Sequence, residues 1–273
     1  MLIKVAHSPD PDDAFMFYAL KMKKFPTPNY EFEDILGDIE TLNREAMKES
    51  YEVTAISIHA YPYISDKYAL LNTGASMGLK YGPIIIANKK LDSLKGKRIA
   101  VPGKLTSAYL ALKLYENNFE EVIMRFDEII EAVSSGKVDC GLIIHEGQVT
   151  FEDMGLKKIV DLGEWWYEET SLPLPLGGNV IKRSLGEKVI SEVSGYLKKS
   201  IEYAMENEEE ALKYAFQFGR GLDSEKNKKF VRMYVNSYTI DYGEDGRTAV
   251  KLLLKKGYEA GIIDRYSEPE FIE

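Results

Sequence analysis

The sequence has a single cysteine, no long apolar run and fewer basic than acidic residues, and each shortage excludes a class of protein. Cys140 alone permits no internal disulfide and no cysteine metal cluster, and its apolar neighbours predict that it packs as a small hydrophobe. No stretch is apolar over the roughly 20 residues that a membrane-spanning helix needs. The 35 basic and 44 acidic residues give a net charge of -9, which disfavours a nucleic-acid partner because the mean field repels a phosphate backbone.

Motifs for nucleotide binding and for export are also missing. The sequence contains neither a G-x-G-x-x-G nor a P-loop pattern, and it has no internal repeat. Residues 1–13, MLIKVAHSPDPDD, pass from a few apolar residues directly into acid and proline, without the basic start and apolar centre of a secretory signal. We therefore expect no cofactor, no metal, no membrane partner and a cytoplasmic location. The oligomeric state stays open, with a homodimer among the alternatives.

What is present is a long alternation of strand and helix patterns. A chain of 273 residues with 45% hydrophobic and 29% charged residues exceeds the common size of one domain, which favours two lobes with separate cores. The alternation predicts parallel sheets with right-handed crossovers. The expected strands are residues 2–6, 30–35, 53–58, 84–87, 98–101, 122–126, 138–144 and 158–162.

Two segments predict crossings between the lobes. The polar residues after the apolar segment 84–87 are expected to form the first crossing, and the proline-rich segment 172–179, which cannot be helical, the return. Residues 1–87 and 178–273 then form a large lobe, and residues 88–177 form a small lobe. This order describes an α/β clamshell with a cleft between its lobes, and it resembles the type II periplasmic binding proteins.

A histidine follows the most apolar of these strands. Residues 138–144 indicate a central parallel strand buried on both faces, and His145 and Glu146 lie at its carboxyl end. Ligands of open α/β sheets collect beyond the carboxyl ends of strands, where an imidazole can transfer protons near neutral pH. We therefore take His145 as the leading candidate for a catalytic residue. The equal alternative is that its ring only hydrogen-bonds a neighbouring carbonyl as the strand ends.

Hydroxyl groups are predicted at two further positions around the same cleft. Ser57 lies near the end of strand 53–58, and Thr106 or Ser107 is expected to cap the helix that begins there. Because a helix amino terminus presents free N–H groups, this helix start is the best candidate for an anion site in the chain. The alternative is that the hydroxyl satisfies only its own helix, while the amides still face a ligand.

The loop 7–13 and the two tryptophans each allow more than one role. Asp12 or Asp13 is expected to cap the helix that follows the loop. The three aspartates of the loop could instead repel an anionic ligand or accept hydrogen bonds from its hydroxyls. Trp165 and Trp166 precede the return crossing, and they either line the cleft or pack beside the hinge.

Six long blocks of the chain are distinctive: SPDPDDAFMFYAL, DIETLNREA, VPGKLTSAYLALKLY, GLIIHEGQVTFEDMGL, VDLGEWWYEETSLPLPLGG and YVNSYTIDYGEDG. Taken in this order, they resemble the 1,4-dihydroxy-6-naphthoate synthase family of the futalosine route to menaquinone. The match runs along almost the whole chain. One departure is that the family pattern SPCPNDTF is replaced by SPDPDDAF at residues 8–15, which adds negative charge to that loop.

The resemblance implies a lyase that acts on an anionic small molecule, cyclic dehypoxanthine futalosine, and releases the bicyclic naphthoate from a sugar-derived remainder. It implies that His145 is the general base and that the strand end 55–57 and the helix start 107–108 contact the substrate. Together with Thr106, the substrate-binding candidates are Ala55, Ile56, Ser57, Thr106, Ser107 and Ala108. The alternatives are chorismate dehydratase, a relative in the same pathway, a non-catalytic solute-binding protein, and a vestigial cleft.

Overall fold

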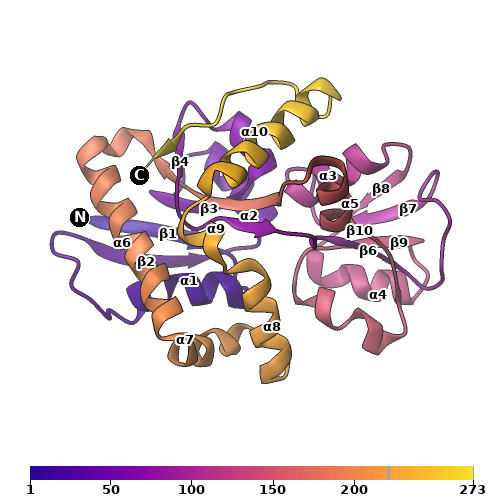
Figure 1. The fold of residues 1–273 in the computed structure, drawn as a ribbon, viewed down its shortest axis with the longest axis horizontal. Helices are drawn as coiled ribbons and strands as arrows, with labels where there is room; N and C mark the ends of the chain where they lie inside the picture. Colours follow the sequence, from indigo (N-terminus) through magenta and orange to yellow (C-terminus); the bar gives the residue numbers. More distant parts are fainter. Residues whose placement is uncertain (220–221, 273) are drawn as a thin grey trace.

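The computed structural model describes residues 1–219 and 222–272, and it contains two sheets side by side, each covered by helices (Figure 1). Within the described residues one sheet has seven strands, in the order β12 (Phe271–Ile272), β4 (Tyr68–Leu71), β11 (Leu174–Lys182), β3 (Val53–Ser57), β1 (Leu2–His7) and β2 (Glu31–Leu36), with β5 (Ser76–Gly78) paired to β11. The other has five, in the order β10 (Lys157–Asp161), β6 (Ile84–Ala87), β9 (Cys140–Ile143), β7 (Arg98–Val101) and β8 (Glu120–Ile123).

We call the seven-stranded sheet with its helices the large lobe, and the five-stranded sheet with its helices the small lobe. The large lobe contains α1 (Pro11–Lys21), α2 (Ile39–Met47), η1 (Ile58–Tyr63), η5 (Arg183–Leu185), α6 (Glu187–Glu206), α7 (Glu208–Ala215), η6 (Phe216–Phe218), α8 (Ser224–Tyr234), α9 (Ser237–Ile240) and α10 (Gly243–Glu259). The small lobe contains α3 (Ser107–Tyr115), η2 (Phe126–Glu128), α4 (Ile129–Ser134), η3 (Glu146–Val149), η4 (Phe151–Met154) and α5 (Leu162–Thr170). Among residues 1–219 and 222–272, no helix of either lobe is long and apolar enough to cross a membrane.

The chain changes sheets earlier than the sequence predicted. β6 pairs with β9 and β10 of the small lobe, so the first crossing precedes this strand, at residues 79–83. β11 pairs with β5 of the large lobe from Leu174 onward, so the return precedes residue 174. The expected boundary after residue 87 therefore lies on the wrong side of β6. The apolar composition of 84–87 predicts a buried strand, but it does not say which sheet the strand joins.

Each sheet is mixed, which corrects the predicted parallel arrangement. β1 pairs in parallel with β2 and β3, and β7 pairs in parallel with β8 and β9. In contrast, β11 runs antiparallel to β3, and β6 runs antiparallel to β9. The parallel strands follow crossover segments within one lobe, whereas β6 and β11 arrive from the other lobe and escape that constraint. The strand that precedes His145, β9, is buried and central, as predicted.

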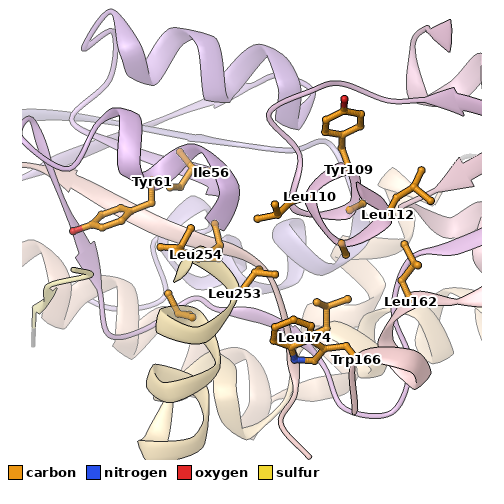
Figure 2. Close-up of a cluster of buried hydrophobic side chains, with 14 of the residues drawn as sticks. Ile56, Tyr61, Tyr109, Leu110, Leu112, Leu162, Trp166, Leu174, Leu253 and Leu254 are labelled. Carbon is orange, nitrogen blue, oxygen red and sulfur yellow. The ribbon is translucent and has the colours of Figure 1, made fainter. Parts of the chain in front are cut away.

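One hydrophobic cluster joins the two lobes beside the crossings. Side chains of α3 and α5 from the small lobe pack with η1 and α10 of the large lobe. Figure 2 shows Leu110 and Trp166 in this cluster with Leu253 of α10. Trp166 is fully buried, and its indole N–H donates to the carbonyl of Pro173 at 3.0 Å. Trp166 therefore packs beside the hinge, which was one of the two roles predicted for it.

Candidate functional site

A cavity lies between the two lobes, where several strands end. All six predicted substrate-binding residues line it, namely Ala55, Ile56, Ser57, Thr106, Ser107 and Ala108. The first three belong to β3 of the large lobe, and the others form the start of α3 of the small lobe. The structure thus brings the two predicted groups together in one cleft, although they are separated by about fifty residues of sequence.

Ser57 is held at the end of β3 by a side chain that the sequence analysis missed. The N–H of Ser57 donates to Oδ1 of Asn43 at 2.8 Å, and Nδ2 of Asn43 donates to the Ser57 hydroxyl at 3.1 Å. Asn43 is fully buried on α2. A polar residue on the buried face of an amphipathic helix was the available signal, because such a residue needs a hydrogen-bond partner.

The two hydroxyls at the start of α3 are both engaged in hydrogen bonds within the protein. Thr106 caps the helix as predicted, since its hydroxyl accepts from the N–H of Tyr109 at 3.1 Å and donates to the carbonyl of Gly103 at 2.9 Å. The Ser107 hydroxyl donates to the carbonyl of Leu176 at 2.5 Å. The N–H groups of the first helical turn have no intrahelical acceptor. Since the N–H of Tyr109 is already bound by Thr106, the amides of Ser107 and Ala108 are the ones at this helix start that can receive an anion.

The aspartate loop also borders the cavity, and its geometry differs from the prediction. The N-cap of α1 is Asp10 instead of Asp12 or Asp13, and its side chain makes no capping hydrogen bond. Pro11 at the first helical position removes one N–H that a cap would satisfy. Ser8 holds two of the three carboxylates, since its N–H donates to Asp13 at 2.8 Å and its hydroxyl donates to Asp10 at 2.9 Å.

The imidazole of His145 does not face this cavity in the structure. The described lining residues include Ile144 but not His145, whose ring packs edge-on against Phe126 with the centroids 5.2 Å apart. The N–H of Gly147 donates to Nδ1 at 3.0 Å, and Nε2 lies 3.0 Å from the carbonyl of Phe126. This network assigns a neutral ring with its proton on Nε2. Main-chain groups thus engage both nitrogens, which is the alternative that the sequence left open.

The turn that carries His145 is connected to the large lobe by a hydrogen bond to Gln148. The hydroxyl of Tyr234, at the end of α8, donates to Oε1 of Gln148 at 2.6 Å. Both side chains are buried, and Tyr234 also lines the cavity. Burial raises the pKa of the Tyr234 hydroxyl well above its usual value, so it remains a donor at neutral pH. No sequence pattern indicated this pair.

His59, a second imidazole near a strand end, supports the helix start. It lies in η1, its N–H donates to the Ser107 hydroxyl at 3.2 Å, and its Nδ1 is 3.2 Å from the carbonyl of Thr106. Burial lowers the pKa of His59 to about 4, against the opposing effect of the Thr106 carbonyl. The ring is therefore neutral at pH 7, and it joins η1 of the large lobe to α3 of the small lobe.

The described residues include neither a cluster of metal ligands nor an exposed thiol. In the portion of the chain that the structure describes, no group of three or more His, Cys, Asp or Glu side chains is placed to hold a metal ion. Cys140 is fully buried in β9, and burial raises the pKa of its thiol to about 11. The thiol therefore stays protonated and packs as a small apolar side chain.

Comparisons with known proteins give the family. A family described as menaquinone biosynthesis matches residues 3–259. The chain is 39% identical over 270 residues to a 1,4-dihydroxy-6-naphtoate synthase of Thermus thermophilus, with 99% of each chain covered. It is 33% identical over 267 residues to the enzyme of that name from Streptomyces coelicolor, covering 96% of this chain and 94% of the relative. The crystal structure of protein AF1704 from Archaeoglobus fulgidus is 51% identical, with a TM-score of 0.93 and coverage of 96% and 98%.

More distant structures agree on the fold alone. A Candida albicans protein described as having the generic periplasmic binding protein fold superposes with a TM-score of 0.72 at 14% identity, covering 98% of this chain and 92% of that one. This likeness confirms the predicted two-lobed α/β clamshell. Since the family match and the relatives extend over nearly the whole chain, the protein is an enzyme that belongs to the 1,4-dihydroxy-6-naphthoate synthase family of menaquinone biosynthesis.

Proposed function

We propose that the cleft binds cyclic dehypoxanthine futalosine and that the enzyme acts on it as a lyase, releasing 1,4-dihydroxy-6-naphthoate. The observation that carries this proposal is that Ser57 from one lobe and Ser107 and Ala108 from the other line one cavity. The first-turn amides of Ser107 and Ala108 have no intrahelical acceptor. Such neutral donors suit a carboxylate in a site shielded from water. The relatives' names supply the identity of the product.

The remaining wall of the cavity suits a flat bicyclic ring. Apolar side chains of Met16, Ile56, Leu176 and Phe230 contribute to the lining, and they come from four different elements of the large lobe. Small-molecule sites commonly combine an apolar wall with a few placed polar groups. We propose that the ring system lies against these side chains while its carboxylate faces the polar groups of β3 and α3.

We further propose that His145 is the general base, after a local rotation of its ring. A base needs a free lone pair, and in the neutral ring that pair is on Nδ1, where the N–H of Gly147 now donates. Rotation breaks this bond and the one to Phe126, at a net cost of about 0.5–1.5 kcal/mol each. A carboxylate oxygen of Glu146 lies 3.6 Å from Nδ1 and could stabilise the imidazolium that proton transfer creates.

The direct test is to incubate the purified protein with cyclic dehypoxanthine futalosine and to identify the product by mass spectrometry. We expect 1,4-dihydroxy-6-naphthoate to form in proportion to the enzyme added. A parallel incubation with chorismate tests the dehydratase alternative, and we expect chorismate to be recovered unchanged. Recovery of unchanged futalosine derivative, or consumption of chorismate, would contradict the proposal.

A further inference from the structure

Both main-chain groups of Leu105, just before α3 in the small lobe, are bound by side chains of the large lobe. The N–H of Leu105 donates to Oε2 of Glu40 at 3.1 Å, and its carbonyl accepts from Nδ2 of Asn43 at 3.4 Å. Glu40 and Asn43 both belong to α2. Because residues three apart lie on one face of a helix, the two side chains can reach the same peptide segment. We call Glu40, Asn43 and Leu105 the Leu105 clamp.

The Glu40 carboxylate is held in place from two sides. Nη2 of Arg44, one turn along α2, donates to Oε1 at 2.7 Å, while Oε2 accepts from Leu105. The Glu40 side chain is 13% exposed, whereas that of Arg44 is 61% exposed. The glycine at position 103 makes room for this contact, since a Cβ there would lie 2.3 Å from Oε2. We therefore expect the shielded bond to Leu105 to be stronger than the exposed ion pair.

The clamp connects the two halves of the proposed substrate site. Asn43 also holds the N–H and the hydroxyl of Ser57 at the end of β3. Leu105 is followed directly by residues 106–108, which line the cavity together with Ser57. One turn of α2 thus sets how the helix start of the small lobe lies relative to Ser57 of the large lobe.

Resting on the proposed function, we propose that Glu40 is a positioning residue, which holds Leu105 so that the amides of Ser107 and Ala108 face the same ligand carboxylate as Ser57. Glu40 is not among the described lining residues of the cavity, so it acts through Leu105 rather than by touching the ligand. An interaction that aligns binding groups equally in the ground state and the transition state changes KM more than kcat.

The helix start keeps other supports when Glu40 is lost. The N–H of His59 in η1 donates to the Ser107 hydroxyl, which in turn donates to the carbonyl of Leu176 in β11. A variant without the Glu40 carboxylate should therefore still fold, with α3 less firmly held toward α2. Asn43 is a less selective target, because its substitution would also release Ser57.

Steady-state kinetics with cyclic dehypoxanthine futalosine test the role. Glu40→Ala removes one charge-assisted hydrogen bond, and we expect KM to rise about tenfold while kcat stays within roughly threefold. Glu40→Gln keeps an oxygen that can accept from Leu105, so KM should stay within about threefold of wild type. Arg44→Gln is the matched control, because it removes the exposed ion pair and leaves the acceptor of Leu105 in place, and KM should change by at most about twofold.

Amide hydrogen exchange of Leu105, followed by NMR without substrate, supplies a readout that is independent of turnover. Protection of this N–H should fall about tenfold in Glu40→Ala and be retained in Glu40→Gln and Arg44→Gln. Equal protection or equal KM in wild type and Glu40→Ala would overturn the positioning role. A loss in Arg44→Gln as large as in Glu40→Ala would overturn it too. A wild-type protein that forms no naphthoate would overturn the proposed function, whereas exchange at Leu105 would still report on the clamp.

Discussion

The turns that follow β3 and β9 have the same local structure, but their histidines form hydrogen bonds with different parts of the molecule. In each, a buried strand runs into a short 3-10 helix that carries an imidazole: β3 leads to His59 in η1, and β9 leads to His145 before η3. His59 bonds across the cleft to the start of α3. The described hydrogen bonds of the His145 ring go to Phe126 and Gly147, which belong to its own lobe.

The difference in hydrogen bonding suggests different roles: His59 connects the two lobes, whereas the His145 ring can rotate within one lobe. Turning the His59 ring would break contacts that hold the two lobes together and would disturb the first turn of α3. Turning the His145 ring breaks two bonds within the small lobe and leaves the contacts between the lobes intact. The histidine with the lowered pKa is therefore suited to a structural role, and the locally held one to proton transfer. The two rings differ in their hydrogen bonds, and substitution of each histidine tests its role.

The largest expected effect is the loss of turnover in His145→Asn. If the ring is the base, kcat should fall by about 10²–10⁴ while KM stays within roughly threefold, because a base acts in the transition state more than in binding. Steady-state kinetics with cyclic dehypoxanthine futalosine give both constants. The counterpart is His59→Asn, which should raise KM more than it lowers kcat. A variant of His145 that keeps kcat within about tenfold would remove it from the mechanism.

A smaller effect is expected in the pH dependence of stability. His59 has a pKa of about 4 in the folded protein and about 6.5 when unfolded. Between these values the unfolded state binds more protons, so stability is full above pH 6.5 and is lost as the pH falls toward 4. Urea denaturation of wild type between pH 7 and 4 should therefore show a loss about 3 kcal/mol larger than that of His59→Asn. Parallel pH curves for the two proteins would show that His59 is not held neutral by the fold.

The smallest effect concerns the tie between the His145 turn and the large lobe. Tyr234→Phe removes the donor to Gln148 and should lower the free energy of unfolding by about 1–2 kcal/mol, since Oε1 is left buried without a partner. Equilibrium unfolding in urea measures this. Tyr242→Phe is the matched control, because the buried Tyr242 hydroxyl has no partner within residues 1–219 and 222–272, and its loss should not destabilise the protein. Equal losses in both variants would show that the tie contributes nothing specific.

Sequence reasoning succeeded where the cause was local. The cap at Thr106 and the strand end at Ser57 depend on residues next to them in the chain, and both lie where they were expected. The order of strands and helices also predicted that Thr106 and Ser57 would lie around one cavity. The strand predicted at 122–126 instead spans Glu120–Ile123, a shift of two to three residues that pairing with β7 decides.

The points that the sequence left open, missed or got wrong have a common physical origin in contacts between distant segments. The orientation of the His145 ring depends on a carbonyl nineteen residues earlier, and the support of Ser57 depends on Asn43 in another element. The sheet that β6 joins is decided by its partners β9 and β10 rather than by its own apolar residues. Periodicity and capping patterns contain no information on such pairings.

The charged side chains among the described lining residues of the cavity are all acidic, and this affects how ionic strength acts on the enzyme. A site that recognised its anionic ligand through lysine or arginine would weaken as added electrolyte screened the attraction. Here the protein has a net charge of -9, and the groups proposed to meet the ligand are the first-turn amides of α3 and the Ser57 hydroxyl. Screening therefore reduces a long-range repulsion, and moderate salt should favour the approach of the ligand while leaving its short-range hydrogen bonds in place.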